Sequence, residues 1–227
     1  MNNKTAILIF ANSAEKETVS KPFHFSKDVF KILNEQTLHV AKKTGLPYFL
    51  FSEKQQVGNS FGERFTNAIQ SVYSKGYDAV ITIGNDTPHL SAKHLTKTIT
   101  QLQKHDLVLG PSTDGGFYLM GLKKSLFNIE AFLKLPWQTS ALNRSISKLS
   151  ALKKTNIYYL EVLTDIDIAS DINTILNSFK SISTYIKQHL LQAVSTKKKI
   201  TSHIYFSVEN FTLKQAYNKG SPLLLHL

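Results

Sequence analysis

The chain has 227 residues, long enough for one full α/β domain with a small appendage, and its hydrophobic content of 42% is ordinary for a globular protein. It contains no cysteine, which excludes structural disulfides, thiolate zinc sites and cysteine nucleophiles. The formal net charge is +11, but lysine supplies nearly all of the positive charge and is scattered, with one tight run at residues 197–199. Nucleic-acid-binding proteins usually cluster lysine and arginine, so we expect no nucleic-acid partner. A solubilising surface, or a general attraction for small phosphate-bearing molecules, fits this pattern better.

Short β-branched runs and helical apolar spacings alternate through the first 180 residues. Strands are predicted at residues 5–11, 48–51, 79–83, 106–110, 116–122 and 157–162. Helices are predicted over residues 26–44, from Phe61 to the stop at Gly76, after the N-cap candidate Ser91, and through Ile172, Ile175, Leu176 and Phe179. This alternation favours an α/β fold with a mainly parallel sheet and helices on both faces.

The two ends of the chain carry weaker signals. The apolar run at residues 6–10 is too short for a signal peptide or a membrane span, so we expect a cytoplasmic protein without a membrane span. After about residue 180, Ile186, Leu190 and Val194 indicate one more helix, followed by the lysine run, a β-like segment at 203–208 and an apolar tail at 223–227. We therefore expect a main domain over 1–180 and an extension over 181–227, which could cap the domain or form a homodimer interface.

Polar residues follow the strand predicted at 79–83, in the sequence Gly84-Asn85-Asp86-Thr87-Pro88. In open α/β sheets, ligands bind just beyond the carboxyl ends of the strands. Gly84 would allow close backbone approach, and the Asp86 carboxylate is a hard oxygen donor suited to Mg²⁺ or Mn²⁺. Taken alone, the segment is more typical of a turn or a helix cap.

Two further acidic segments follow later strands. In Asp165-Ile166-Asp167 the two carboxylates project to the same side of an extended segment and could face one cation, although Asp167 could equally cap the next helix. In Asp114-Gly115-Gly116 the paired glycines would let a ligand approach the backbone. A tight hairpin turn is the simpler interpretation of that segment.

Arginine is rare here: Arg64 and Arg144 are the two arginines in a chain that otherwise uses lysine. Arg64 follows Gln56-Val57-Gly58, and a site that needs a bidentate fork for phosphate or carboxylate cannot replace arginine freely. A surface pair of Glu63 with Arg64 is the simpler alternative. No Gly-x-Ser-x-Gly, Walker or Gly-x-Gly-x-x-Gly pattern is present, which argues against serine hydrolases, P-loop proteins and dinucleotide-binding domains.

Five segments, taken in order, resemble a bacterial family of glycosyltransferase-A-like proteins that includes members named for arsenosugar biosynthesis. The segments are QVGNSFGER (56–64), GNDTP (84–88), GPSTDGGF (110–117), PWQT (136–139) and DIDI (165–168). Each is modest alone, but their order and spacing match the family pattern over roughly residues 5–179. The resemblance implies a Rossmann-like nucleotide-diphospho-sugar transferase fold (GT-A) with a mixed, mostly parallel sheet, shared by sugar transferases and nucleotidyltransferases.

The resemblance also implies roles for individual residues. Asp86 would hold a metal ion, with Asp165 or Asp167 completing the site from the far side. Asp114 would line the sugar or acceptor pocket with Gly115 and Gly116, and it is our candidate for the general base that an inverting reaction would need. Trp137 would flank this pocket, with a core or interface position as the simpler alternative. The remaining residues expected to bind substrate are Gly58, Arg64, Gly84, Asn85 and Lys21.

The chain departs from the family pattern after the first strand. Members carry a Gly-x-x-Lys-Thr-Arg-like loop that should meet the nucleotide phosphates, whereas residues 12–22 read NSAEKETVSKP. The glycine and arginine are absent, two glutamates are nearby, and Lys21 would stand in for the lysine. In addition, Asn85 replaces a family serine and Ile168 a threonine.

The function implied is a metal-dependent glycosyltransferase that uses a nucleotide sugar, a small-molecule acceptor, and Mg²⁺ or Mn²⁺ to neutralise the leaving diphosphate. One alternative is a nucleotidyltransferase on the same fold. Another is a catalytically degenerate binding or assembly protein that uses the C-terminal extension as an interface.

Overall fold

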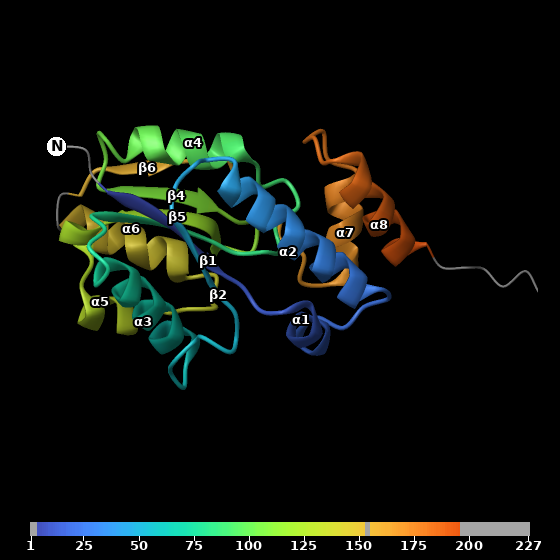
Figure 1. Ribbon diagram of the computed structural model, residues 1–227, viewed down its shortest axis with the longest axis horizontal. Coiled ribbons are helices and arrows are strands. Elements are labelled where there is room, and N and C mark those ends of the chain that lie inside the picture. The colour runs from blue at the N-terminus through green and yellow to red at the C-terminus, as the bar shows by residue number, and fades with distance from the viewer. Residues whose placement is uncertain (1–3, 153–154, 196–227) are drawn as a thin grey trace, which may run out of the picture. The chain divides into compact units, whose positions relative to one another are not determined.

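A single mixed sheet organises the part of the chain that the computed structural model describes, residues 4–152 and 155–195. Its strands are β1 (Thr5–Phe10), β2 (Tyr48–Phe51), β3 (Ala79–Ile83), β4 (Leu107–Pro111), β5 (Phe117–Lys123) and β6 (Ile157–Tyr159), in the order β2-β1-β3-β5-β4-β6 (Figure 1). Strand β5 runs antiparallel to β3 and β4, and the other neighbours are parallel. The expected mostly parallel α/β sheet is confirmed.

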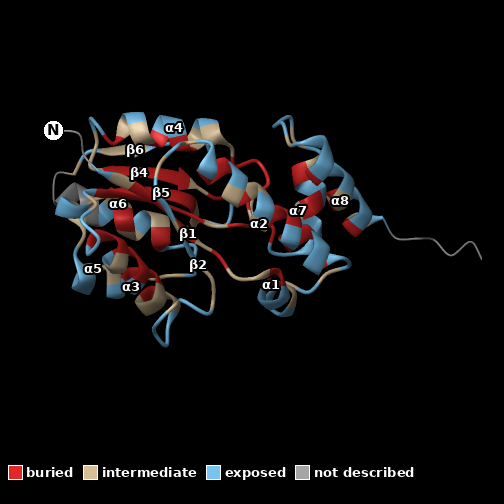
Figure 2. Ribbon diagram, in the orientation of Figure 1, coloured by how far each residue is buried: buried red, intermediate tan, exposed pale blue. Residues whose placement is uncertain are grey.

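Helices cover both faces of this sheet. They are α1 (Ala14–Ser20), α2 (Ser26–Lys42), α3 (Phe61–Tyr73), α4 (Ala92–Gln101), α5 (Ile129–Leu133), α6 (Leu142–Leu152), α7 (Ala169–Leu176) and α8 (Thr184–Val194), with a 3₁₀ turn at Lys124–Leu126. Helix α2 contacts α4 and helix α3 contacts α5, and Figure 1 shows α4 and α3 on opposite sides of the sheet. Successive side chains of β1 point to opposite faces of the sheet: Ile7 packs in the core on the side of α2 and α4, and Leu8 packs in the core on the side of α3. The central strands β1, β3, β4 and β5 are buried almost throughout, whereas the edge strands β2 and β6 are partly exposed (Figure 2).

A third apolar cluster lies where α1, α2, α7 and α8 meet. Phe30 of α2, Ile172 and Ile175 of α7, and Ile186 and Leu190 of α8 are all buried in it. The helix expected after residue 180 is therefore confirmed as α8, which contacts α2 and α7. The lysine run and the segments 203–208 and 223–227 lie outside the described residues, and the division of the chain at residue 180 stays a prediction.

Two sequence predictions fail at element ends. The strand expected to reach residue 162 ends at Tyr159. The last hydrogen bond of its pairing with β4 is donated by the Leu160 N–H, and beyond it the described residues form only an isolated bridge at Leu163. Phe179 was expected on the inner face of a helix, but α7 ends at Leu176 and the Phe179 side chain is fully exposed. Helices α1, α5 and α6 were not predicted.

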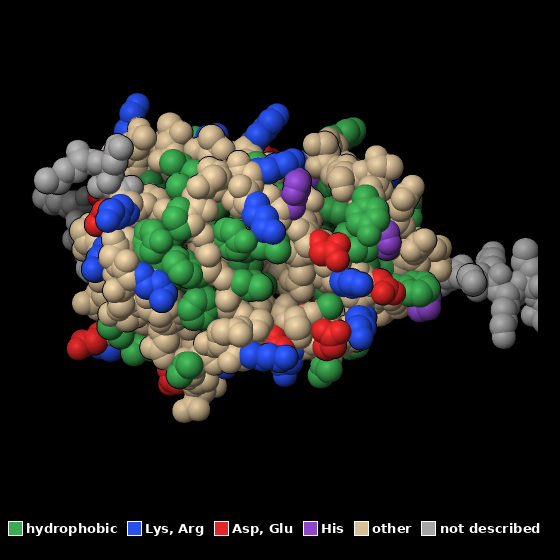
Figure 3. Space-filling view, viewed as in Figure 1, with side chains coloured by type: hydrophobic (Ala, Val, Ile, Leu, Met, Phe, Trp, Pro, Cys, Tyr) green, Lys and Arg blue, Asp and Glu red, His purple; other side chains and the backbone are tan. Residues whose placement is uncertain are grey.

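Two surface features bear on function. Within the described residues, no helix combines the length and apolar character needed to cross a lipid bilayer. On the face shown in Figure 3, lysine and arginine side chains are dispersed among other residues rather than gathered into one patch. This distribution agrees with the scattered lysines of the sequence.

Candidate functional site

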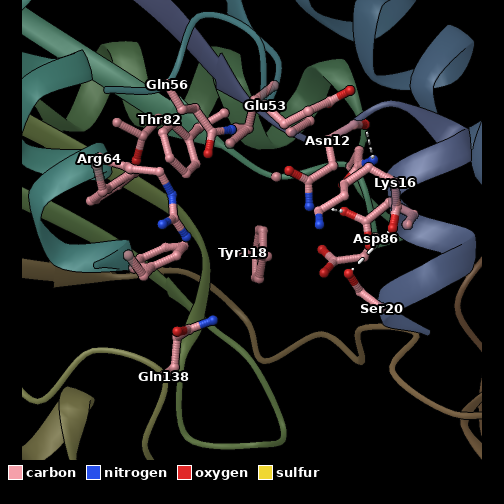
Figure 4. A pocket seen from close by; sticks show the side chains of 18 of the residues that line it. Asn12, Lys16, Ser20, Glu53, Gln56, Arg64, Thr82, Asp86, Tyr118 and Gln138 are labelled. Atoms are coloured by element: carbon pink, nitrogen blue, oxygen red, sulfur yellow. Dashed lines mark hydrogen bonds between the residues drawn. The ribbon is translucent and has the colours of Figure 1, made fainter. Parts of the chain in front are cut away.

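A pocket opens where the connections of the sheet diverge. The chain leaves β1 toward β2 on one side, while β3 leads toward the strands on the other side, which makes the carboxyl ends of β1 and β3 a topological switch point. A cavity of about 630 Å³ lies there, within the usual range for small-molecule sites. Its lining includes Asn12 after β1, Gly84, Asn85 and Asp86 after β3, and Arg64 from α3 (Figure 4).

The residues after β3 divide between binding and structural contacts. Asp86 faces the pocket, whereas Asn85 is buried and its Nδ2 donates to Asn34 Oδ1 of α2 at 2.8 Å. A Cβ added at Gly84 would lie 3.2 Å from Asp86 Oδ1, so glycine leaves room for this carboxylate. Asn85 therefore lines the pocket but also anchors the β3 loop to α2, whereas the Asp86 side chain is 27% exposed at the pocket.

Lys21, at the C-terminal end of α1, meets two of the expected metal ligands. Its Nζ lies 2.7 Å from Asp86 Oδ2 and 2.8 Å from Asp167 Oδ1, and it donates to the Ile166 carbonyl at 3.0 Å. Burial alone would lower the pKa of the Lys21 ammonium, but the charge of Asp86 and the hydrogen bonds to both carboxylates raise it well above its ordinary value. The lysine is therefore charged at all physiological pH values.

Asp165 makes a different contact from Asp167. Its Oδ1 accepts from Thr87 Oγ1 at 2.7 Å. Burial, and then the nearby charge of Asp86, raise the pKa of Asp165 to about 7. Within the described residues, no group of three or more histidine, cysteine, aspartate or glutamate side chains is placed to hold a metal ion. The cap of α7 is supplied by Asp171, whose Oδ2 accepts from the backbone N–H groups of Asp167 and Ile168, and not by Asp167.

Arg64 approaches the pocket from the opposite wall. Ser60 caps α3, and Glu63 Oε2 accepts from the Asn59 backbone N–H at 2.6 Å. The alternative surface pair of Glu63 with Arg64 is not among the ion pairs of the described residues, and the Arg64 guanidinium makes a long 3.4 Å bond to the Asn59 carbonyl. Figure 4 shows the guanidinium directed into the cavity. Gly58 lines the same wall with φ 136°, and a Cβ there would lie 2.6 Å from the Glu63 Cβ.

Helix α1 lies where the sequence resemblance led us to expect a phosphate-binding loop, and it was not predicted from the sequence. Ser13 caps it by accepting from the Lys16 N–H, and Glu53 accepts from both the backbone and the hydroxyl of Ser13 at 2.8 Å. The helix places Glu17, which is 5% exposed, at the pocket, and burial raises the pKa of this carboxyl. The available signal was a serine followed by a helix-forming Ala-Glu-Lys-Glu run.

The Asp114-Gly115-Gly116 segment forms the turn between the antiparallel strands β4 and β5, so the hairpin interpretation is correct. Asp114 Oδ1 accepts from the Gly116 N–H at 2.9 Å. Gly115 has φ 94°, and an added Cβ would lie 2.8 Å from the Ser140 carbonyl oxygen. None of the three residues is among those that line the pocket, so their role toward an acceptor stays a prediction.

Trp137 lies behind the aromatic wall of the pocket. It packs against Phe61, Phe65 and Phe117, which do line the cavity, and its Nε1 donates to the Phe132 carbonyl at 2.7 Å. The next residue, Gln138, reaches the pocket (Figure 4). Trp137 therefore has the core position given as its alternative, and its contact with substrate stays a prediction.

Comparisons with known proteins agree with this architecture. Residues 33–139 match the profile of the family DUF2064, described as an uncharacterized protein conserved in bacteria. A protein of Desulfovibrio desulfuricans G20, provisionally assigned as a nucleotide-diphospho-sugar transferase, superposes with a TM-score of 0.73 and 22% identity over 84% of this chain and 96% of its own. The chain thus has the nucleotide-diphospho-sugar transferase fold, as predicted.

Two more distant structures cover similar shares of the chain. The 4-diphosphocytidyl-2C-methyl-D-erythritol synthase of Anaerococcus prevotii DSM 20548 gives a TM-score of 0.49 with 10% identity, over 85% of this chain and 97% of its own. The Rv0371C protein of Mycobacterium tuberculosis H37Rv, in complex with manganese, gives a TM-score of 0.44 with 12% identity, over 77% of this chain and 99% of its own. Both scores are too low to add to the assignment of the fold. No curated protein matches the chain.

Proposed function

We propose that the protein is a transferase that binds a nucleotide-activated substrate in the pocket between the ends of β1 and β3. The observation that carries the proposal is the Arg64 guanidinium, which faces a cavity of about 630 Å³ and forms no ion pair within the described residues. A planar fork of this kind suits a phosphate or carboxylate group. Gly58, Gly84 and Phe61 complete the walls that a nucleotide would contact.

The charges around the pocket favour a nucleotide sugar over a nucleoside triphosphate. The described lining contains the basic residues Lys16, Lys21 and Arg64 and the acidic residues Glu17, Glu53 and Asp86. Because these charges balance, a ligand of lower negative charge is accommodated at smaller electrostatic cost. Glycosyl transfer to a small acceptor is therefore our first proposal, and nucleotidyl transfer is the second.

The proposed acceptor side includes Asp114, Gly115, Gly116 and Trp137. For Asp114 to act as general base, its carboxylate would have to leave the hydrogen bond to Gly116 and reach the acceptor hydroxyl. That step is part of the proposal and rests on the resemblance of the sequence.

The expected Mg²⁺ or Mn²⁺ does not fit these residues as they lie. Asp86 Oδ2 and Asp167 Oδ1 contact the Lys21 ammonium, and Asp165 Oδ1 accepts from Thr87. A divalent cation would supply charge neutralisation to a leaving diphosphate, but the Lys21 ammonium already lies between the two carboxylates that would bind it. We assign no step of the reaction to a metal.

A binding or assembly protein without catalysis remains the proposal from another class. It is favoured by α1, which places the buried Glu17 where the family has its phosphate loop. A homodimer interface in the extension 181–227 and a cytoplasmic location remain expectations from the sequence.

A thermal-shift panel of nucleotide sugars, nucleoside diphosphates and nucleoside triphosphates tests the proposal, since a bound ligand stabilises the folded state. We expect a nucleotide sugar to raise Tm and Arg64→Ala to weaken its affinity by about 10–100-fold, because charged hydrogen bonds contribute about 1.5–3 kcal/mol. Arg144→Ala, which removes an exposed arginine on α6, is the matched control. Release of a nucleoside diphosphate would mark glycosyl transfer, and release of pyrophosphate would mark nucleotidyl transfer. A panel without any shift would contradict both.

A further inference from the structure

The Lys21 ammonium is surrounded by three oxygens from two separate segments. Asp86 Oδ2 at 2.7 Å belongs to the loop after β3, and Asp167 Oδ1 at 2.8 Å and the Ile166 carbonyl at 3.0 Å belong to the segment before α7. An ammonium has three N–H donors and no acceptor. These three oxygens therefore match the full donor capacity of the lysine.

The same oxygens are the type that a hard divalent cation would use. Two carboxylates and one backbone carbonyl are suitable ligands for Mg²⁺ or Mn²⁺. Their separations from Nζ, however, are those of charge-assisted hydrogen bonds and exceed the ~2.0–2.1 Å of Mg²⁺–oxygen bonds. A cation position is thus formed by oxygens at the carboxyl end of the sheet, and a side chain of the protein occupies it.

The surroundings hold this arrangement in place without a ligand. The Ile166 side chain is fully buried, and its backbone N–H donates to the Asp86 carbonyl at 2.9 Å, so the two segments that supply the oxygens are joined directly. The Lys21 side chain is 17% exposed, and its Nζ lies 5.7 Å from the centre of the buried Phe30 ring. Glu53 fixes the start of α1 through Ser13.

We propose that Lys21 is the resident cation of this site and takes the place of a divalent metal. Its positive charge holds Asp86 and Asp167 together at the pocket edge and offsets their charge toward an anionic ligand. Where it concerns that ligand, the inference rests on the proposed function. The cation position itself can be tested without a nucleotide.

The experiment measures Mn²⁺ binding by electron paramagnetic resonance and by thermal shift, with Mn²⁺ as the sole probe. We expect no site of high affinity in the wild-type protein. Lys21→Met, which keeps an unbranched stem but removes the ammonium group and its charge, is expected to gain one site. Its Tm should rise by roughly 5–10 °C with Mn²⁺ at ~100 times its dissociation constant. Lys16→Met is the matched control, because Lys16 also lies on α1 and lines the pocket but forms no ion pair within the described residues.

Three results would overturn the proposal. The first is a Mn²⁺ site in the wild-type protein that Asp86→Asn abolishes. The second is a folded Lys21→Met variant that binds no Mn²⁺. The third is a gained site that survives in the Lys21→Met/Asp86→Asn double variant. If Lys21→Met does not fold in the absence of metal, Lys21→Gln provides a neutral side chain that can still donate hydrogen bonds. These results do not depend on nucleotide binding, so failure of the nucleotide panel would contradict the proposed function and leave this test intact.

Discussion

Lys21 and Arg64 both bring positive charge to one pocket, but the two residues differ in what they leave for a ligand. The Lys21 ammonium is mostly buried and its three donors meet three protein oxygens. The Arg64 guanidinium is partly exposed, and within the described residues its hydrogen bonding is limited to a 3.4 Å contact with the Asn59 carbonyl. A basic residue at a pocket is therefore no guarantee of a charge that substrate can use, because neighbouring carboxylates decide its availability.

The largest expected effect is on the free energy of unfolding, which should fall much more when Lys21 is replaced than when Arg64 is replaced. Lys21→Met should lower the free energy of unfolding by about 2–3 kcal/mol, somewhat less than for a fully buried pair, because the Asp167 side chain is 50% exposed. Arg64→Ala should change it by about 0.5 kcal/mol or less, since the residue makes no ion pair within the described residues. Urea unfolding monitored by circular dichroism measures both. Equal losses in the two variants would show that the two basic residues do not differ in this way.

A second prediction concerns the wall that carries Arg64. A Cβ at Gly62 would lie 2.5 Å from Trp137 Cδ1. The indole is held by aromatic neighbours and by the hydrogen bond that its Nε1 donates to the Phe132 carbonyl. Gly62→Ala should therefore cost about 1–3 kcal/mol of stability and displace the start of α3, with weaker ligand binding at Arg64. Mn²⁺ behaviour at Lys21, on the opposite wall, should stay as in the wild-type protein. Calorimetry and the Mn²⁺ titration check the two parts, and unchanged stability would contradict the packing argument.

The third prediction, the smallest when taken per pH unit, is a pH dependence of the free energy of unfolding next to the Lys21 site. The pKa of Asp165 is raised to about 7 in the folded protein, so between about pH 4 and 7 the folded state holds a proton that the unfolded chain has lost. The protonated Asp165 carboxyl therefore contributes fully to the stability of the folded state below the pKa of the unfolded chain. This contribution is lost as the pH rises through the folded-state pKa of about 7. Asp165→Asn should remove up to about 1 kcal/mol per pH unit of this slope while its side-chain oxygen still accepts from Thr87.

Urea titrations of both proteins at several pH values between 4 and 8 provide this measurement. Taking the difference between wild type and Asp165→Asn removes the contribution of the histidines, which titrate in the same range. Parallel curves for the two proteins would show that Asp165 does not hold its proton in the folded state.

Several parts of the fold could be predicted from local pattern alone. Strand β3 and helix α2 have strong β-branched or helical apolar periodicity, and both appear within a residue or two of the predicted bounds. Helix α1 was missed because its seven residues carry no long apolar period. Its formation depends on the Ser13 cap and on Glu53, which lies 40 residues further along the chain.

The candidate site likewise has residues that the sequence predicted and contacts that it could not predict. Sequence order identified Asp86, Arg64, Gly58 and Gly84, which do line one pocket, because the carboxyl ends of neighbouring parallel strands meet at one edge of a sheet. It could not separate Asp165 from Asp167, since both lie in one extended segment. Their different partners, Thr87 and Lys21, come from distant parts of the chain.

The sequence by itself determined the class of fold, the strand that delivers Asp86 and the absence of cysteine chemistry, because these depend on composition and on short-range periodicity. The tertiary structure alone decided what each charged group faces. Lys21 stands 65 residues from Asp86 and 145 from Ile166 in the chain. Whether a carboxylate meets a metal, a ligand or a lysine depends on such long-range contacts, which no local pattern specifies.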